Sequence, residues 1–310
     1  MNSEHELDFR NLQVDKEDPT VSYNDQLHKY WVKNTNQPCI SVTTLIHKFT
    51  TFDEHFWSCY KALEALVDSD KFKSVKSNLL DTKKFDEKYL NILDISIDTF
   101  TEKRNEILAQ WDAKREASCL RGTAIHKEHE LEHLSGNTKE LQHLGLGGKF
   151  IPNTTNVLDI GQQKVYPEML LSYISDEEDD FRLAGQADLI IVDGSDVYIL
   201  DYKTNESIDK KSYFDFKTKK STMMKYPLNN LQDTNFWHYS MQLSTYAWMI
   251  EKKYPGVNIK LLMLIHYDHN GNCTTYECDY LKSDVEKMLS YYKKELKHEK
   301  FKESRKKIKF

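Results

Sequence analysis

Two aspartates and a lysine in the middle of the chain form the set of residues best suited to chemistry. Asp188 lies in the segment RLAGQADLIIV, and Asp201 and Lys203 follow in DVYILDYKT. Side chains alternate along a strand, so Asp201 and Lys203 share one face. Carboxylates that converge from paired strands suit Mg²⁺ or Mn²⁺, and such an ion can activate water for hydrolysis of a phosphodiester. The alternative is a surface hairpin whose charges only pair with each other.

The segments around these residues predict the strands that would hold them. Residues 165–174, 182–192 and 196–204 are rich in β-branched and aromatic side chains, which is typical of strands. The sequence DGSD between the last two predicts a hairpin turn. A helix is expected from Trp237 to Lys252, followed by a buried strand at 259–267 and a last helix with a capping box at its start.

The N-terminal third has a different pattern. Residues 20–48 alternate as strands do, whereas residues 53–111 have the amphipathic spacing of helices. Gly122 is expected to interrupt the helical pattern, and Thr123 to cap a new helix that runs through Leu134. The order of elements predicts an α/β fold, with a mainly helical N-terminal part (residues 1–115) and a core of sheet and flanking helices (residues 116–310).

A second candidate for chemistry is HELEH at residues 129–133, which matches the H-E-x-x-H motif of zinc proteases. Catalytic zinc needs a third protein ligand. Lys139 stands where metzincins have their third His, and Glu140 is expected to lie too near in sequence to fold back as a ligand. The zinc protease therefore remains a third alternative, behind the metal-dependent hydrolase.

The motifs around the aspartates resemble those of PD-(D/E)xK nucleases, and in particular the RecB-like exonuclease branch. That branch has G-x-x-D, then D-x-K, then Q-x-x-x-Y on a following helix. The corresponding residues here are Gly185 to Asp188, Asp201 to Lys203, and Gln242 with Tyr246. The resemblance covers about residues 25–270, and LHKYWV and SVTTLIHKF near the N-terminus are similar to phage and mitochondrial exonucleases. It implies a central mixed β-sheet flanked by helices, the core shared with restriction endonucleases.

The resemblance also assigns roles. A His within G-T-x-x-H supplies a metal ligand in this branch, which points to His126 after Gly122 and Thr123. His126, Asp188 and Asp201 would then hold Mg²⁺ or Mn²⁺, with a backbone carbonyl of Leu189 or Tyr202. The other residues with implied catalytic roles are Lys203, Gln242, Tyr246 and Glu168.

The same resemblance gives the helix expected from Thr123 to Leu134, which contains HELEH, another purpose. His126 is expected to face the carboxylates of the sheet, while Leu131 and Leu134 pack on the core. His129 and His133 are then expected at the surface, and HELEH is expected to be a coincidence.

Between Lys203 and Gln242 lies a longer segment than the branch usually has, and it is rich in lysine and aromatic residues. The chain carries a net charge of −6, so any attraction to nucleic acid must be local. Lysine with exposed aromatic rings suits single strands. The predicted nucleic-acid contacts are Lys210, Lys211, Lys217, Lys219, Lys220, Lys225, Phe214 and Phe216. The alternative is a solvated loop.

Composition indicates the cellular compartment in which the protein is expected to act. No stretch approaches the roughly 20 apolar residues of a membrane helix, and the five scattered cysteines suit free thiols in a reducing compartment. We therefore expect a cytoplasmic enzyme without membrane contact, in the host cytoplasm if a phage encodes it, with DNA and replication or recombination proteins as partners. A catalytically idle nuclease fold that only binds nucleic acid is the second alternative.

Overall fold

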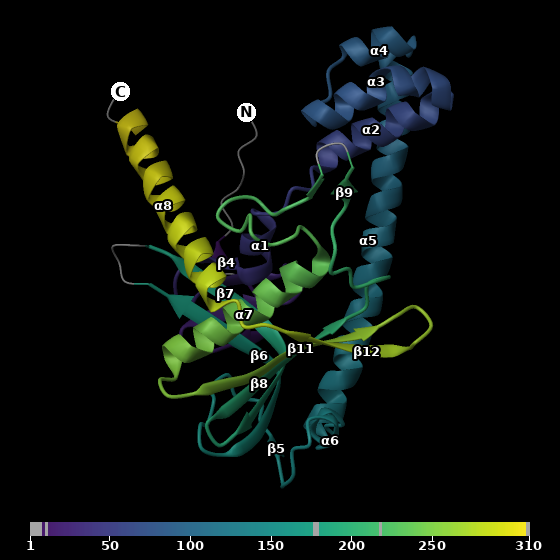
Figure 1. Ribbon diagram of the computed structural model, residues 1–310. Helices are drawn as coiled ribbons and strands as arrows, with labels where there is room; N and C mark the ends of the chain where they lie inside the picture. Colours follow the sequence, from purple (N-terminus) through teal and green to yellow (C-terminus); the bar gives the residue numbers. More distant parts are fainter. Residues whose placement is uncertain (1–7, 10–11, 176–179, 217–218, 308–310) are drawn as a thin grey trace. The chain divides into compact units, whose positions relative to one another are not determined.

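The structure of the protein is a computed structural model that describes residues 8–9, 12–175, 180–216 and 219–307 (Figure 1). The chain divides into two compact units, residues 52–123 and residues 1–51 together with 124–310. None of the helices in the described residues is both long and apolar enough to cross a membrane. All five cysteines are free.

The smaller unit is helical, as the spacing of apolar residues predicts. Its helices are α2 (Glu54–Leu66), α3 (Ser69–Thr82), α4 (Lys88–Leu93) and the first part of α5 (Ile97–Leu134). The side chains of Asp53 and Asp68 cap the first two helices by accepting from the backbone N–H three residues ahead. Apolar side chains on the inner faces, such as Phe56 and Leu79, form a separate buried cluster.

Helix α5 continues without a break through Gly122, so the predicted interruption and the predicted cap at Thr123 are wrong. A glycine inside a helix costs only about 1 kcal/mol relative to alanine. Good helix formers on both sides of Gly122 can offset that cost, because each added residue extends a helix that already exists.

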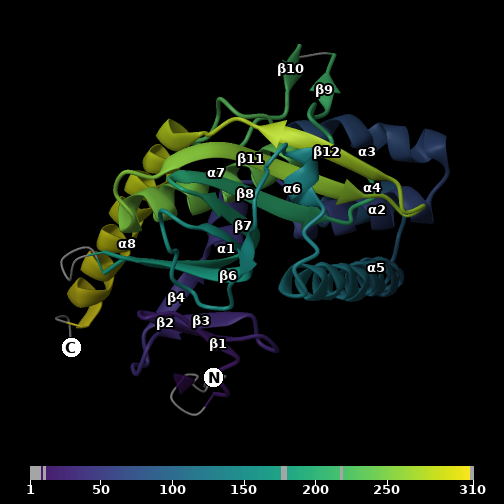
Figure 2. The same ribbon diagram turned by 90° about the horizontal axis from the view of Figure 1, so that it is seen from below.

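The larger unit is built on a ten-stranded mixed sheet in the order β1-β2-β3-β4-β7-β8-β11-β12, with β6 on the other edge of β7 and β5 next to β6 (Figure 2). Its strands are β1 (Lys16–Glu17), β2 (Val21–Asn24), β3 (Lys29–Val32), β4 (Pro38–Ser41), β5 (Ile151–Pro152), β6 (Gln163–Ile174), β7 (Arg182–Asp193), β8 (Asp196–Lys203), β11 (Asn258–Tyr267) and β12 (Cys273–Cys278). The expected hairpin turn joins β7 to β8, with Gly194 in left-handed backbone.

Strand β7 changes its neighbour along one edge. Leu183 and Ala184 pair with the short strand β4, whereas residues 189–193 pair with β8. The described residues give no ladder pair on that edge between 185 and 188, while β6 pairs with β7 along the opposite edge except at Asp188. The sheet therefore separates locally at Gly185–Asp188.

Helices cover both faces of the sheet, which confirms the predicted α/β class. On one face lie α1 (Val42–His47), α7 (Asn235–Lys253) and α8 (Lys282–Lys307), which share one apolar core with the inward side chains of β6, β7, β8 and β11. A smaller core on the opposite face includes Leu200 and Tyr202 and is covered by α6 (Glu140–His143) and the segment after it. Side-chain alternation on β8 thus directs Asp201 and Lys203 to the α7 face and Tyr202 to the α6 face.

Candidate active site

Asp188 lies where β7 and β8 begin to pair. Its side chain is 7% exposed, and its Oδ2 accepts a hydrogen bond of 2.7 Å from the backbone N–H of Tyr202. The last ladder pair before this point is Leu189 with Leu200. The carboxylate therefore takes the place of the next ladder bond, and its other oxygen stays available on the α7 side.

Asp201 and Lys203 form an ion pair on the neighbouring strand, which fits the prediction that their side chains share one face. Asp201 is 1% exposed, and its Oδ1 also accepts from Gln242 Nε2 at 3.2 Å. The Lys203 ammonium lies 4.6 Å from the ring centroid of Tyr239. Burial works against the charged lysine, but the carboxylates of Asp201 and Asp188 outweigh it and raise the pKa of Lys203. The lysine is therefore a fixed cation in this pocket.

Helix α7 brings Gln242 and Tyr246 to the same place. Both are buried, and Gln242 Nε2 donates to the Tyr246 hydroxyl at 3.1 Å as well as to Asp201. The Tyr246 ring passes close to Gly185, where an added Cβ would meet its Cε1 at 2.7 Å. The glycine of G-x-x-D is thus required by the tyrosine of Q-x-x-x-Y, which links two motifs 61 positions apart.

His126 comes to the carboxylates from α5. Its Nδ1 lies 3.5 Å from Asp188 Oδ1 and 3.5 Å from Glu168 Oε1. Its Nε2 lies 3.2 Å from the carbonyl oxygen of Tyr202, to which it donates. This hydrogen bond leaves Nδ1 directed at the carboxylates, as in histidines that bind metals through one nitrogen and are oriented through the other.

Glu168 reaches this cluster through an unusual backbone. It follows Pro167 in β6 and has φ of +49°, in the left-handed region that non-glycine residues avoid. The ladder between β6 and β7 pairs Pro167 with Leu189 and Met169 with Ala187. Left-handed non-glycine residues cost on the order of 1–3 kcal/mol and cluster at functional sites. The strained backbone thus belongs to a residue whose carboxylate is part of the candidate site.

The electrostatics show how crowded the acidic groups are. Burial, and next the charge of Asp201, raise the pKa of Asp188 to about 8. Burial by itself would lower the pKa of His126, but Asp188 and Glu168 raise it to about 9. The charges of His126 and of the carboxylates around it are therefore strongly dependent on one another.

One atom from each of His126, Glu168 and Asp188 lies within 4.8 Å of the others, so these three residues could hold a metal ion. Two carboxylates and one imidazole suit Mg²⁺ or Mn²⁺. A cavity of about 300 Å³ lies next to the cluster and is lined by Glu168 together with Lys16 and Glu130. The predicted third ligand, Asp201, is held instead by Lys203 and Gln242, and the predicted carbonyl of Tyr202 bonds His126.

The predicted nucleic-acid segment forms a small hairpin of β9 (Phe214–Asp215) and β10 (Lys220–Ser221), which projects from the larger unit (Figure 2). Phe216 is 84% exposed and packs edge to face on Phe214. The exposed lysines of this segment are Lys210, Lys211, Lys219, Lys220 and Lys225, and Lys217 lies outside the described residues. Of these, the ammonium of Lys210 lies 4.4 Å from the ring centroid of Phe236, at the edge of the core.

The expectations for HELEH are wrong in three respects. His133 is 1% exposed and the His129 side chain 12%, so neither is a surface residue, whereas Leu131 is 56% exposed. Glu140 does fold back, and its Oε2 lies 3.9 Å from His133 Nδ1. Gly136, with φ of +84°, ends α5 in a Schellman motif that reverses the chain.

The motif nevertheless lacks the arrangement of a zinc protease. The glutamate of H-E-x-x-H should be the general base beside the metal. Glu130 instead binds Lys127 Nζ at 2.7 Å and lies 3.8 Å from Lys16 Nζ, on the side of the cavity next to Glu168. His129 and His133 therefore have no such base in the described residues.

Comparison with known proteins decides the family. The family model described as "PD-(D/E)XK nuclease superfamily" matches residues 61–307, which include every residue of the candidate active site. The chain belongs to the PD-(D/E)XK nuclease superfamily.

The other comparisons give less information about this PD-(D/E)XK protein. No curated protein matches the sequence. A solved structure titled "Crystal structure of SSO0001" is 18% identical with a TM-score of 0.26, and the match covers 41% of this chain and 48% of that one. The chain thus spans about half the length of that protein.

Proposed function

We propose that this protein is a metal-dependent DNA exonuclease of the RecB-like branch. The observation that carries the proposal is the convergence of Glu168, Asp188 and His126 beside the Asp201–Lys203 pair. A nuclease needs a cation-binding carboxylate cluster and a fixed positive group for the phosphate, and these residues supply both within one buried corner of the sheet.

In this proposal His126, Glu168 and Asp188 hold Mg²⁺ or Mn²⁺, and Asp201 is the further candidate ligand because its charge acts on Asp188. When bound, such an ion polarises a phosphoryl oxygen and lowers the pKa of a water molecule. Lys203 remains protonated beside Asp201 and orients the water or stabilises charge on the phosphate. The carbonyl of Tyr202 accepts from Nε2 of His126, which keeps the ring in the tautomer whose Nδ1 lone pair can bind the ion.

The α7 residues act as positioning groups. Gln242 donates to Asp201, and the hydroxyl of Tyr246 lies beside Gln242. An amide that donates to the carboxylate fixes its orientation without adding charge. Loss of Gln242 would therefore leave Lys203 as the side chain that holds the Asp201 carboxylate among the described residues.

The lysine and aromatic hairpin is the proposed path of the DNA. Exposed rings such as Phe216 offer stacking surfaces, and lysines contact phosphates without reading sequence. Since the net charge of −6 opposes long-range attraction, binding would depend on this local patch. We propose that a strand enters from its free end, which makes the protein an exonuclease acting in the cytoplasm with phage-like or host replication partners.

The deciding experiment compares linear and closed circular DNA as substrates. Linear DNA labelled at one end should release labelled mononucleotides or short oligonucleotides with Mn²⁺ or Mg²⁺ and none with EDTA. Circles of the same sequence, single-stranded and duplex, should remain intact. Rapid cutting of the circles would show an endonuclease, and binding without cleavage of either substrate would show an idle nuclease fold.

A further inference from the structure

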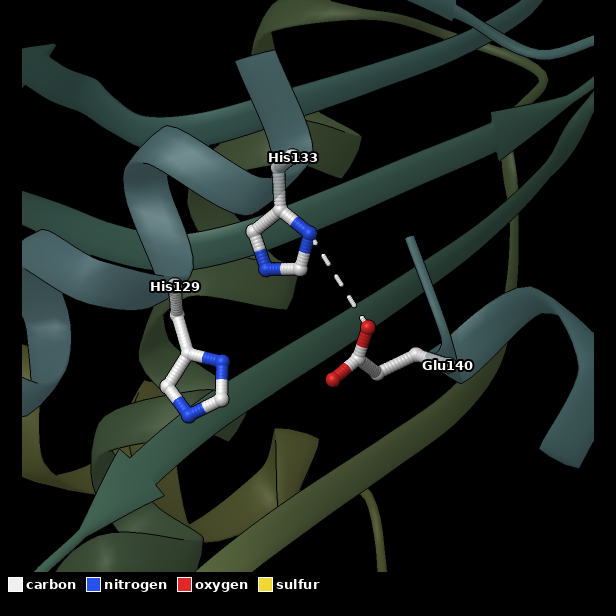
Figure 3. Close-up of side chains that lie close together, drawn as sticks. All are labelled: His129, His133 and Glu140. Atoms are coloured by element: carbon white, nitrogen blue, oxygen red, sulfur yellow. Dashed lines mark ion pairs between the residues drawn. The ribbon is translucent and has the colours of Figure 1, made fainter. Parts of the chain in front are cut away.

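A second cluster of metal-ligand side chains lies on the α6 face of the sheet. His129 and His133, one turn apart on α5, face Glu140 at the start of α6 (Figure 3). One donor atom from each residue lies within 4.8 Å of the other two. Two histidines four residues apart with a carboxylate from a following turn is a common arrangement of zinc ligands.

Two buried atoms of this cluster are available to bind a cation. Glu140 Oε2 and His129 Nδ1 have no hydrogen-bond partner among the described residues, and Glu140 is only 8% exposed. The nearest charged group to His129 Nδ1 is Glu132 Oε2 at 3.5 Å, but Glu132 binds Lys139 through its other oxygen. A buried carboxylate oxygen without a donor is costly.

The hydrogen bonds of the Tyr202 hydroxyl determine where the protons of this cluster lie. Tyr202 has one hydroxyl proton and donates it to Glu140 Oε1 at 2.9 Å. His133 Nε2, 2.9 Å from the same hydroxyl, must then be the donor to it. The Nδ1 of neutral His133 is left with a lone pair that faces Glu140 Oε2 at 3.9 Å, with the Thr138 hydroxyl 3.3 Å away as a weak donor.

We propose that His129, His133 and Glu140 bind a second metal ion of the Zn²⁺ class, separate from the nuclease site. Bonds of about 2.0–2.2 Å in a tetrahedral site place ligand atoms about 3.3–3.6 Å apart. The Glu140 Oε2 to His133 Nδ1 distance of 3.9 Å must therefore shorten by about half an ångström. The distances to the His129 ligand atom, which are within 4.8 Å, must shorten by at most about 1.5 Å. Two imidazoles favour Zn²⁺ over Mg²⁺.

The ion would have a structural role, because the cluster is nearly closed to solvent and Glu130 is directed elsewhere. The His129 ring stacks on the Tyr202 ring, with centroids 4.1 Å apart and planes 3° apart. Tyr202 in turn bonds Asp188 through its N–H and His126 through its carbonyl. A metal that joins α5 to α6 around this ring would fix the backbone that orients both nuclease ligands.

The test measures Zn²⁺ binding to the full-length protein in the presence of excess Mg²⁺, by equilibrium dialysis and metal analysis. The wild type should retain one Zn²⁺ per chain and gain thermal stability from it, since a ligand that binds only the folded state stabilises it. Co²⁺ in its place should give the visible absorption of a tetrahedral nitrogen and oxygen site.

Glu140→Gln is the main variant, because its amide oxygen can still accept from Tyr202 and the fold is kept. It should weaken Zn²⁺ binding by more than the roughly 10–100-fold that loss of an outer hydrogen-bond partner causes, and His129→Asn should do the same. His143→Gln, at an exposed histidine three residues beyond Glu140, is the matched control and should bind as the wild type does. Asp188→Asn should also keep the Zn²⁺.

Two outcomes would overturn the proposal. One is a wild-type protein that retains no Zn²⁺ against Mg²⁺, which would leave the cluster as a hydrogen-bond network around Tyr202. The other is loss of Zn²⁺ in Asp188→Asn with retention in Glu140→Gln, which would assign the ion to the nuclease site. Because the readout is metal content, neither outcome depends on whether the protein cuts DNA.

Discussion

The two faces of the sheet at Tyr202 carry clusters of similar size but opposite character. On the α7 face, carboxylates outnumber imidazoles, and the pKa values of Asp188 and His126 are raised by burial among charges and by the neighbouring carboxylates, respectively. On the α6 face, two imidazoles meet one carboxylate, and burial lowers the pKa of His129 and His133. Helix α5 supplies histidines to both clusters, at positions only three residues apart.

This difference shows that the neighbours of a histidine, rather than its place in a motif, decide what it can bind. His126 faces oxygen donors at an accessible corner of the sheet, whereas His129 faces another imidazole under the aromatic ring of Tyr202. The oxygen-rich set around His126 suits a hard ion such as Mg²⁺ or Mn²⁺, which must also bind a phosphate. The set around His129 suits Zn²⁺, a borderline-soft ion, in a structural role.

Asp201→Asn should have the largest effect on activity, because it changes the cluster on the α7 face. The change removes the charge that acts on Asp188 and the carboxylate that forms the ion pair with Lys203. The rate of nucleotide release from linear DNA should fall by about three orders of magnitude or more, since metal and lysine electrostatics each contribute several kcal/mol. Zn²⁺ content should stay at the wild-type level. Retained hydrolysis in this variant would falsify the proposed active site.

A second prediction compares neighbouring residues of the same helix. His126→Ala should lower the cleavage rate by about 100-fold or more, because it removes a ligand and an imidazole that balances two carboxylates. Glu130→Gln is the matched control, since the ion pairs of Glu130 among the described residues are with Lys16 and Lys127, and it should change the rate by less than about threefold. Equal losses in the two variants would contradict the assignment of His126, and selective loss in Glu130→Gln would restore the protease hypothesis.

Gly185→Ala should affect stability together with activity. The added methyl group would lie 2.7 Å from the Tyr246 ring, and overpacking of this kind costs about 1–3 kcal/mol. Chemical denaturation gives the free energy of unfolding. Tyr246→Leu should relieve the contact, so the double variant should lose less stability than the sum of the two single changes. Simple additivity would show that the two motifs are not coupled through this contact.

The smallest expected effect concerns the lysine hairpin, which neither cluster touches. Replacing Lys217, Lys219 and Lys220 with Ala should weaken binding of single-stranded DNA at low salt. The slope of log affinity against log salt should fall by about 0.7 for each lost phosphate contact, or roughly two units in total. Cleavage of DNA that is already bound should change little. An unchanged slope would identify the segment as a solvated loop.

Local sequence is enough to predict the part of the site that depends on local geometry. Period-two alternation places Asp201 and Lys203 on one face of β8, and helical spacing places Gln242 beside Tyr246 on α7. The order of helices and strands is also sufficient for the α/β class. Each of these properties depends on residues a few positions apart.

The features that the sequence did not reveal depend on chain reversals and long-range contacts. The return of Glu140 to His133 depends on the left-handed turn at Gly136, and the Ser-Gly-Asn run after α5 was the available signal for it. The continuity of α5 through Gly122 was missed because a glycine weakens a helix without ending it. No local pattern could show that the strained backbone of Glu168 would bring its carboxylate to His126.

The change of neighbour along β7 has a consequence for the entropy of binding. Ladders with β4 and β8 fix the strand on both sides of Gly185–Asp188, and β6 fixes its opposite edge. The four residues between these anchors are therefore ordered during folding, although this edge has no ladder partner there in the described structure. A ligand that arrives there meets a backbone with little conformational freedom left to lose, so more of its interaction free energy contributes to affinity.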